Sequence, residues 1–187
     1  MKRSLRLGIA VVALALIAAA CGGGDNLAEA IINSQTDGAN VDISNNGQNI
    51  SFQDDEGNNV TINTDNEGNV TVESEGGDQQ ISFGTNAEIP AEFPLPIAPG
   101  GTVAFSMSTP EGATYTIRYP RDSFDQIAAM YTEFMDATPG EQSVSNGSSD
   151  GYKWFNMFIT REDGVSLSAS LSQSDQETSV SLSSSSS

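Results

Sequence analysis

The residue types in this chain exclude most catalytic mechanisms. Its 187 residues include 25 aspartates and glutamates but no histidine, and Cys21 is the one cysteine. Without histidine, neither a Ser-His-Asp nor a Cys-His arrangement can form, and no metal site can include imidazole. A carboxylate pair remains a chemical route to hydrolysis. Most carboxylates, however, stand beside Asn and Gly in turn-like segments, where water keeps them ionised, so we expect no catalytic residue.

Two acidic turns form a candidate cation site. Asp54, Asp55 and Glu56 lie in one turn, and Glu75 and Asp78 lie in a later one. In an antiparallel meander alternate turns share one end of the sheet, so these carboxylates would gather there. Oxygen ligands of this kind are those that Ca²⁺ takes. The sequence therefore predicts a weak Ca²⁺ site and no other cofactor, and the alternative is that these turns stay apart in solution.

The most apolar stretch after the N-terminal segment covers residues 152–159. A strand that is apolar on both faces is normally central and buried, so we expect Trp154 in the core. The alternative is an aromatic surface at Tyr152 and Trp154 that binds a sugar or a peptide. Alternation separates two sets of side chains, which are Tyr152, Trp154 and Phe158 on one face and Phe155, Met157 and Ile159 on the other.

Cys21 follows a segment typical of export signals. An apolar run from Leu7 to Ala20 follows three basic residues, Lys2, Arg3 and Arg6. This run is shorter than a helix that spans a bilayer, which needs about 20 residues. Residues 18–21, AAAC, resemble the lipobox of bacterial lipoproteins, whose pattern is Leu, small, small, Cys, although alanine replaces the leucine. The resemblance implies cleavage before Cys21 and its acylation, which would anchor the chain to a lipid bilayer. The alternative is an ordinary signal peptide cleaved after Ala20.

The charge of the chain excludes one class of partner. The formal net charge is −18, and no lysine or arginine occurs between Arg6 and Arg118. Such an acidic chain repels the phosphates of nucleic acids, so we expect no nucleic-acid partner.

The chain divides into five segments by composition. A signal peptide (1–20) and a glycine-rich tether (21–25) precede a short helix with an acidic β-repeat (26–87). The repeat consists of apolar pairs about ten residues apart, which are Val41/Ile43, Ile50/Phe52, Val60/Ile62, Val70/Val72 and Ile81/Phe83. Each pair brackets one polar residue, which predicts short strands in an antiparallel meander with one apolar face. A β-solenoid is the alternative.

The remaining segments are a proline-rich connector (88–101) and an α+β domain (102–187). The connector carries Ile89, Phe93, Leu95 and Ile97, so we expect it to pack against the fold. In the domain, strands at 102–107 and 113–119 precede a helix that a capping box at Ser123–Gln126 opens. Three strands follow, at 152–160, 165–171 and 179–183. The expected buried stripe of the helix is Phe124, Ile127, Ala128, Tyr131, Phe134 and Met135.

These patterns predict an α+β fold, mainly antiparallel β, in which an acidic N-terminal meander packs with a C-terminal ββαβββ unit. From residue 25 onward the layout resembles uncharacterised actinobacterial exported lipoproteins, a resemblance that implies no activity. We expect a membrane-anchored extracytoplasmic lipoprotein that is a non-catalytic binding or structural module of the cell envelope. Its partners would be the bilayer, through acylated Cys21, and an envelope ligand or protein. The alternative is a carboxylate-based extracellular hydrolase that acts on envelope polysaccharide.

Overall fold

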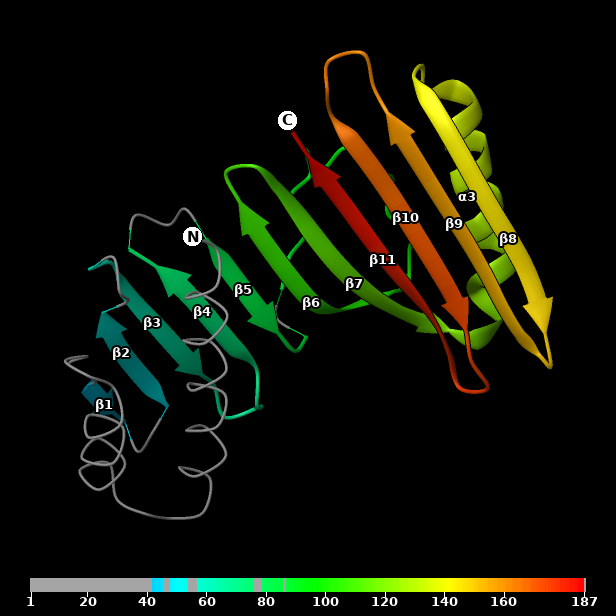
Figure 1. Ribbon diagram of the computed structural model, residues 1–187. Helices are drawn as coiled ribbons and strands as arrows, with labels where there is room; N and C mark the ends of the chain where they lie inside the picture. The colour runs from blue at the N-terminus through cyan, green and yellow to red at the C-terminus, as the bar shows by residue number, and fades with distance from the viewer. Residues whose placement is uncertain (1–41, 46–47, 54–56, 76–78, 86, 187) are drawn as a thin grey trace. The chain divides into compact units, whose positions relative to one another are not determined.

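The computed structural model describes residues 42–45, 48–53, 57–75, 79–85 and 87–186 (Figure 1). These residues form mainly antiparallel β-sheet with one α-helix, which agrees with the predicted α+β class. The chain divides into two compact units, of which unit 1 ends at Gln80 and unit 2 begins at Ile81. The predicted signal peptide, the tether and the short helix expected at the start of segment 26–87 lie outside the described residues.

The described part of unit 1 contains four short strands that pair antiparallel in chain order, unlike the stacked coils of a solenoid. They are β1 (Asp42–Ser44), β2 (Asn49–Gln53), β3 (Asn59–Thr64) and β4 (Val70–Ser74). Ile50 lies opposite both Ile43 and Ile62, and all three side chains are buried. Because the apolar residues of each pair are two positions apart, they point to the same face. Phe52, Val70 and Val72 pack against this small core.

The turn between β3 and β4 shows how an acidic residue shapes a hairpin. The Asp65 carboxylate accepts hydrogen bonds from the backbone N–H groups of Glu67 and Asn69, both at 2.9 Å. It also accepts one from Asn69 Nδ2 at 2.7 Å, which contributes most to holding the pKa of Asp65 below its ordinary value of 3.8. Gly68 has φ of 82°, a conformation that favours glycine. The carboxylate is therefore engaged in the turn itself.

Unit 2 is an antiparallel sheet in which the last strand of the chain lies in the interior. β11 pairs with β7 on one side and with β10 on the other. The order is β5 (Gln80–Phe83), which enters unit 2 at Ile81, then β6 (Thr102–Thr109), β7 (Gly112–Pro120), β11 (Glu177–Ser185), β10 (Ser166–Gln173), β9 (Tyr152–Thr160) and β8 (Glu141–Ser149).

The predicted ββαβββ order is wrong by one strand. Four strands follow the helix, because residues 141–149 form β8, which pairs with β9. The sequence of β8, EQSVSNGSS, has no alternation of apolar and polar residues, because Val144 is its one large apolar residue. β8 is an edge strand of the sheet. An edge strand packs too little apolar surface for the alternation to appear.

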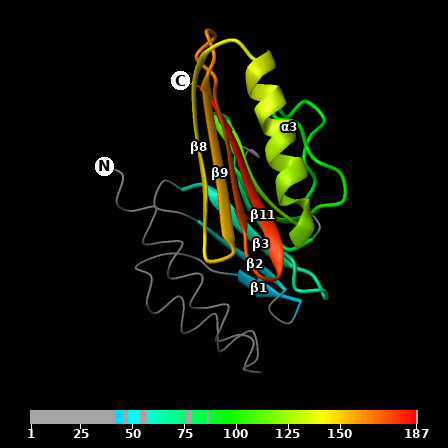
Figure 2. The ribbon, with the colours of Figure 1, turned by 90° about the vertical axis from the view of Figure 1, so that its right-hand side faces the viewer.

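Helix α3 (Phe124–Ala137) covers one face of this sheet (Figure 2). The expected stripe is confirmed, because Phe124, Ile127, Tyr131 and Met135 are buried in the core and Ala128 and Phe134 pack against it. The predicted capping box is wrong. Ser123 ends a 3₁₀ turn, Arg121–Ser123, with helical backbone angles, and its side chain makes no capping hydrogen bond.

The proline-rich connector packs on the same face as α3. Leu95 and Ala98 are buried in the core cluster, with Ile89 and Phe93 against it. The Tyr131 hydroxyl donates a hydrogen bond to the Pro96 carbonyl at 2.9 Å, and the Tyr119 hydroxyl donates one to the Ala98 carbonyl at 3.0 Å. The expectation is wrong for Ile97, which is exposed. We name this side of the sheet the covered face and the other side the open face.

Candidate functional site

The open face of unit 2 consists of the side chains that alternate with the buried ones. On β9 the buried residues are Phe155, Met157 and Ile159. The alternating residues on β10 and β11 are serines. On four of the strands the open face comprises Thr114, Thr116 and Arg118 on β7, Tyr152, Trp154, Asn156 and Phe158 on β9, Ser166, Ser168, Ser170 and Ser172 on β10, and Ser179, Ser181 and Ser183 on β11.

Strand register arranges these side chains in rows across the sheet. Trp154 lies opposite Gly147 on one side and Ser172 on the other, and Ser172 lies opposite Ser179. In the next row, Asn156 lies opposite Ser145 and Ser170, and Ser170 lies opposite Ser181. Each row therefore has one large side chain on β9, with serines on β10 and β11.

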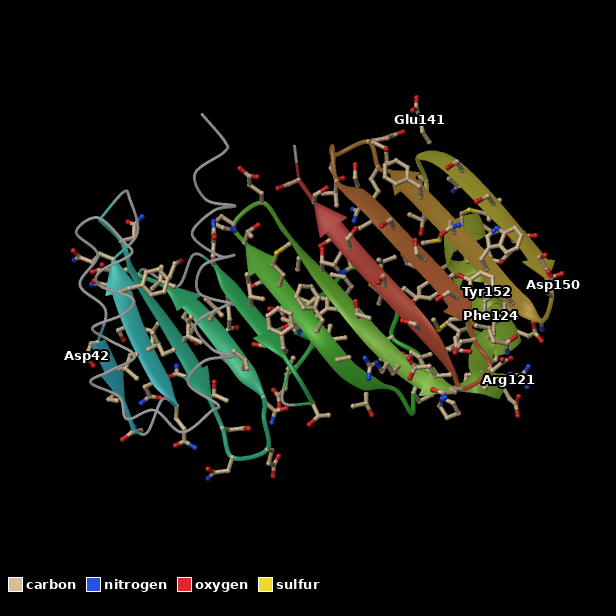
Figure 3. All side chains as sticks on the ribbon, turned by 60° about the horizontal axis from the view of Figure 1, so that its bottom comes forward. Asp42, Arg121, Phe124, Glu141, Asp150 and Tyr152 are labelled. Atoms are coloured by element: carbon tan, nitrogen blue, oxygen red, sulfur yellow. The ribbon has the colours of Figure 1, made fainter. Side chains whose placement is uncertain are left out.

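Trp154 leans toward the edge strand. A Cβ atom added at Gly147 would overlap the six-membered ring of the indole, so the ring lies over the backbone of Gly147. The Tyr152 ring stacks beside it, with ring centroids 6.2 Å apart and planes inclined by 26°. In Figure 3, Tyr152 on β9 lies beside the turn residue Asp150, where β8 ends and β9 begins. Glu141 marks the opposite end of β8. The two aromatic rings thus lie next to each other, and the absence of a side chain at Gly147 leaves room for the indole.

The expectation that Trp154 belongs to the core is wrong. It is half-buried, and the neighbouring Tyr152 is 47% exposed. The reason is that α3 and the connector pack on one face only, so the second apolar face of β9 is the open face. The alternative prediction, that Tyr152 and Trp154 form an aromatic surface, agrees with this geometry. That a sugar or a peptide binds there stays a prediction.

A depression of about 360 Å³ lies beside the aromatic pair. It results from the difference in height between the aromatic rings on β9 and the serines next to them, and none of its lining residues is charged. These residues are Tyr152, Trp154, Asn156, Ser170, Leu171, Ser172, Ser179 and Ser181.

The serine hydroxyls in the depression differ from those beyond it. Ser168 and Ser183 hydrogen-bond to each other at 2.8 Å, outside the depression. By contrast, the side-chain hydroxyls of Ser170, Ser172 and Ser179 have no hydrogen-bond partner among the described residues. These three hydroxyls are therefore available to a ligand. Their alternation with Leu, Ala and Val was visible in the sequence, but the contact between Trp154 and Gly147 depends on register and was not.

A second depression, of about 350 Å³, lies near the β6–β7 turn. Glu92 of the connector and Glu111 of the turn both line it, together with Phe93 and Tyr115. Both glutamates are exposed. The general acid of a glycoside hydrolase normally lies in an apolar, water-excluded environment. This pair lacks that environment.

The predicted cation site cannot be assembled from what the structure describes. Asp54, Asp55, Glu56 and Asp78 lie outside the described residues, as does Cys21. Glu75 is described, and its Oε2 accepts a hydrogen bond from the backbone N–H of Asn59 at 3.0 Å. Within the described ranges, no group of three or more Cys, Asp or Glu side chains could hold a metal ion.

In the described part of the chain, no helix has the length and apolar character needed to cross a membrane. Comparisons with protein-family models, with curated proteins and with solved structures found no match to this chain. What the chain binds has therefore to be inferred from the open face itself.

Proposed function

We propose that this chain is a membrane-anchored extracytoplasmic lipoprotein that serves as a non-catalytic binding module of the cell envelope. Its binding surface would be the open face of unit 2. The observation that supports this is the partly exposed pair of Tyr152 and Trp154 beside an uncharged depression. Ligand sites are typically concave, with aromatic side chains and a few polar groups that orient the ligand.

In this proposal the acylated Cys21 holds the chain to the bilayer. The acidic β-repeat follows the anchor in the chain, and all of its apolar pairs except Ile81/Phe83 precede unit 2. Its carboxylates repel anionic lipid head groups, which suits a segment that separates the anchor from a binding domain. The weak Ca²⁺ site at the acidic turns stays a prediction.

Sedimentation with delipidated bacterial cell walls tests the binding surface. We expect the full chain to sediment with the walls and Trp154→Ala to remain in solution. Val144→Ala is the matched control, because Val144 is also an exposed apolar residue of the sheet but is not on the open face. If Trp154→Ala sediments as well as the unmodified chain does, the open face is not the binding surface.

One observation favours the alternative hydrolase of envelope polysaccharide. Glu92 and Glu111 line the same depression, as a pair of catalytic carboxylates would. Their exposure places this function second. The test is the release of reducing ends from purified cell walls. Release that is abolished in the double variant Glu92→Gln/Glu111→Gln would replace the binding module with an enzyme.

A further inference from the structure

We infer that the depression beside Trp154 binds the uncharged sugar rings of a polysaccharide. This inference rests on the proposed function and specifies the ligand class of the same surface. Three properties of the depression support it: its aromatic wall, its serine floor and its lack of charge.

The aromatic wall matches one side of a sugar ring. A pyranose ring has a face of C–H bonds, which is apolar, and a rim of hydroxyl groups, which is polar. The ring centroids of Tyr152 and Trp154 are 6.2 Å apart and their planes are inclined by 26°, so the pair offers two neighbouring apolar rings to a ligand. The backbone of Gly147 supports the indole in this position before a ligand arrives. A preorganised aromatic surface binds with a low entropic cost.

The floor matches the rim of the sugar ring. The hydroxyls of Ser170, Ser172 and Ser179 each donate one hydrogen bond and accept others, as sugar hydroxyls do. Within the described chain they have no other partner. Asn156 adds an amide, whose Nδ2 donates to Ser145 Oγ at 3.4 Å, a long hydrogen bond that leaves its other groups available.

The absence of charge selects against ionic ligands. The chain has a formal net charge of −18, yet the lining of the depression contains no carboxylate. It contains no lysine or arginine either, so an anionic ligand would lose hydration without gaining an ion pair. An uncharged ligand rich in hydroxyl groups is the class that this lining satisfies.

Backbone pairing disfavours an extended peptide. Peptides that bind sheets usually add a strand through main-chain hydrogen bonds at an exposed edge. The depression lies over β9, β10 and β11, and each of these strands pairs with a strand on both sides. Only side chains are therefore available to the ligand. The volume of about 360 Å³ is near the lower end of the range for ligand pockets, so it would hold a short stretch of a longer polymer.

Trp154 is the one tryptophan of the chain, so its fluorescence reports on this site directly. The full chain is titrated with cellohexaose, chitohexaose and maltohexaose as neutral probes, with hexagalacturonic acid as the anionic probe and with a proline-rich decapeptide. We expect a saturable change with at least one neutral hexasaccharide and none with the other two probes. The inference is overturned if no neutral hexasaccharide binds, or if the anionic probe or the peptide binds more tightly.

Paired variants on one strand test the geometry. Ser172→Ala removes a hydroxyl of the floor and should weaken binding about three- to tenfold. Ser168→Ala is the control, because Ser168 lies on the same strand and face but outside the depression. Tyr152→Ala should weaken binding at least about tenfold, with the unfolding midpoint showing that the fold is intact. Equal effects of Ser172→Ala and Ser168→Ala would contradict the inference.

The two proposals fail in different ways. If none of the neutral hexasaccharides binds but Trp154→Ala still prevents sedimentation with cell walls, the binding module stands and the sugar class is wrong. If Trp154→Ala sediments normally and no hexasaccharide binds, both proposals are wrong.

Discussion

The indole ring of Trp154 lies over the backbone of Gly147, its cross-strand neighbour on the edge strand β8. Any side chain at position 147 would occupy the space of the ring. The glycine therefore directs the indole toward β8, and the space above the serines of β10 stays open. One residue without a side chain thus accounts for both the aromatic wall and the depression beside it.

Gly147→Ala should displace the indole and remove the wall. The new Cβ meets the far end of a side chain rather than backbone, so the free energy of unfolding should fall by only about 1 kcal/mol. We expect a red shift of the Trp154 emission and weaker binding to cell walls. Ser143→Ala, on the same face of β8 but opposite Phe158 and outside the depression, is the control. An unchanged emission spectrum would show that the ring does not depend on Gly147.

Tyr131→Phe should loosen the connector. The variant leaves the Pro96 carbonyl without its donor at 2.9 Å, so the free energy of unfolding should fall by about 1 kcal/mol in urea titrations. Tyr152→Phe removes a hydroxyl from the exposed side of the sheet and should have no effect. Equal stability of the two variants would contradict the role of the Tyr131 hydroxyl.

Stability should be independent of tyrosine ionisation below pH 10 and should fall above it. Burial raises the pKa values of Tyr131 and Tyr119 above the ordinary value of 10.0. Above pH 10 the unfolded chain releases these protons while the folded chain keeps them, so unfolding becomes more favourable. Each such group costs at most about 1.4 kcal/mol per pH unit.

The variant Tyr131→Phe provides the control for this pH dependence. It has lost one of the ionising groups, so its stability deficit relative to the unmodified chain should shrink as the pH rises above 10. Urea unfolding at pH 8, 10 and 11 measures the difference. A deficit that grows over this range would contradict the assigned direction.

The ion pair between Lys153 and Asp125 should contribute little to stability. Lys153 Nζ lies 2.8 Å from both carboxylate oxygens, but the two side chains are 37% and 78% exposed. A double-mutant cycle with Lys153→Met and Asp125→Asn should give a coupling energy below about 1 kcal/mol, and added salt should reduce it. A larger, salt-independent coupling would mean that the pair is shielded from water.

Cys21→Ser should abolish acylation. The intact mass of the chain purified from membranes should include the acyl groups, and the serine variant should lack them and be unprocessed or released from the membrane. If the variant loses its signal peptide and still fractionates with membranes, the lipoprotein interpretation is wrong.

The strands that pack an apolar face could be predicted from the sequence. Strand β8, which packs no such face, could not. β9 covers the predicted residues 152–160, since a short run of large apolar and aromatic side chains is a strong local signal. β8 was missed because its residues are exposed at an edge. The prediction of a capping box at Ser123–Gln126 was wrong because the 3₁₀ turn that precedes α3 depends on a tertiary contact: the Thr178 hydroxyl of β11 donates a hydrogen bond to the Arg121 carbonyl.

The sequence by itself determined which side chains of β10 and β11 share a face, because the period of a strand is two residues and serine alternates there with Leu, Ala and Val. It also excluded histidine-dependent chemistry. Only the tertiary structure decided that α3 covers one face of β9 and leaves Trp154 on the other. Only register brought Trp154 beside Gly147 and Ser172, because a shift of one residue between strands would exchange the faces of every side chain.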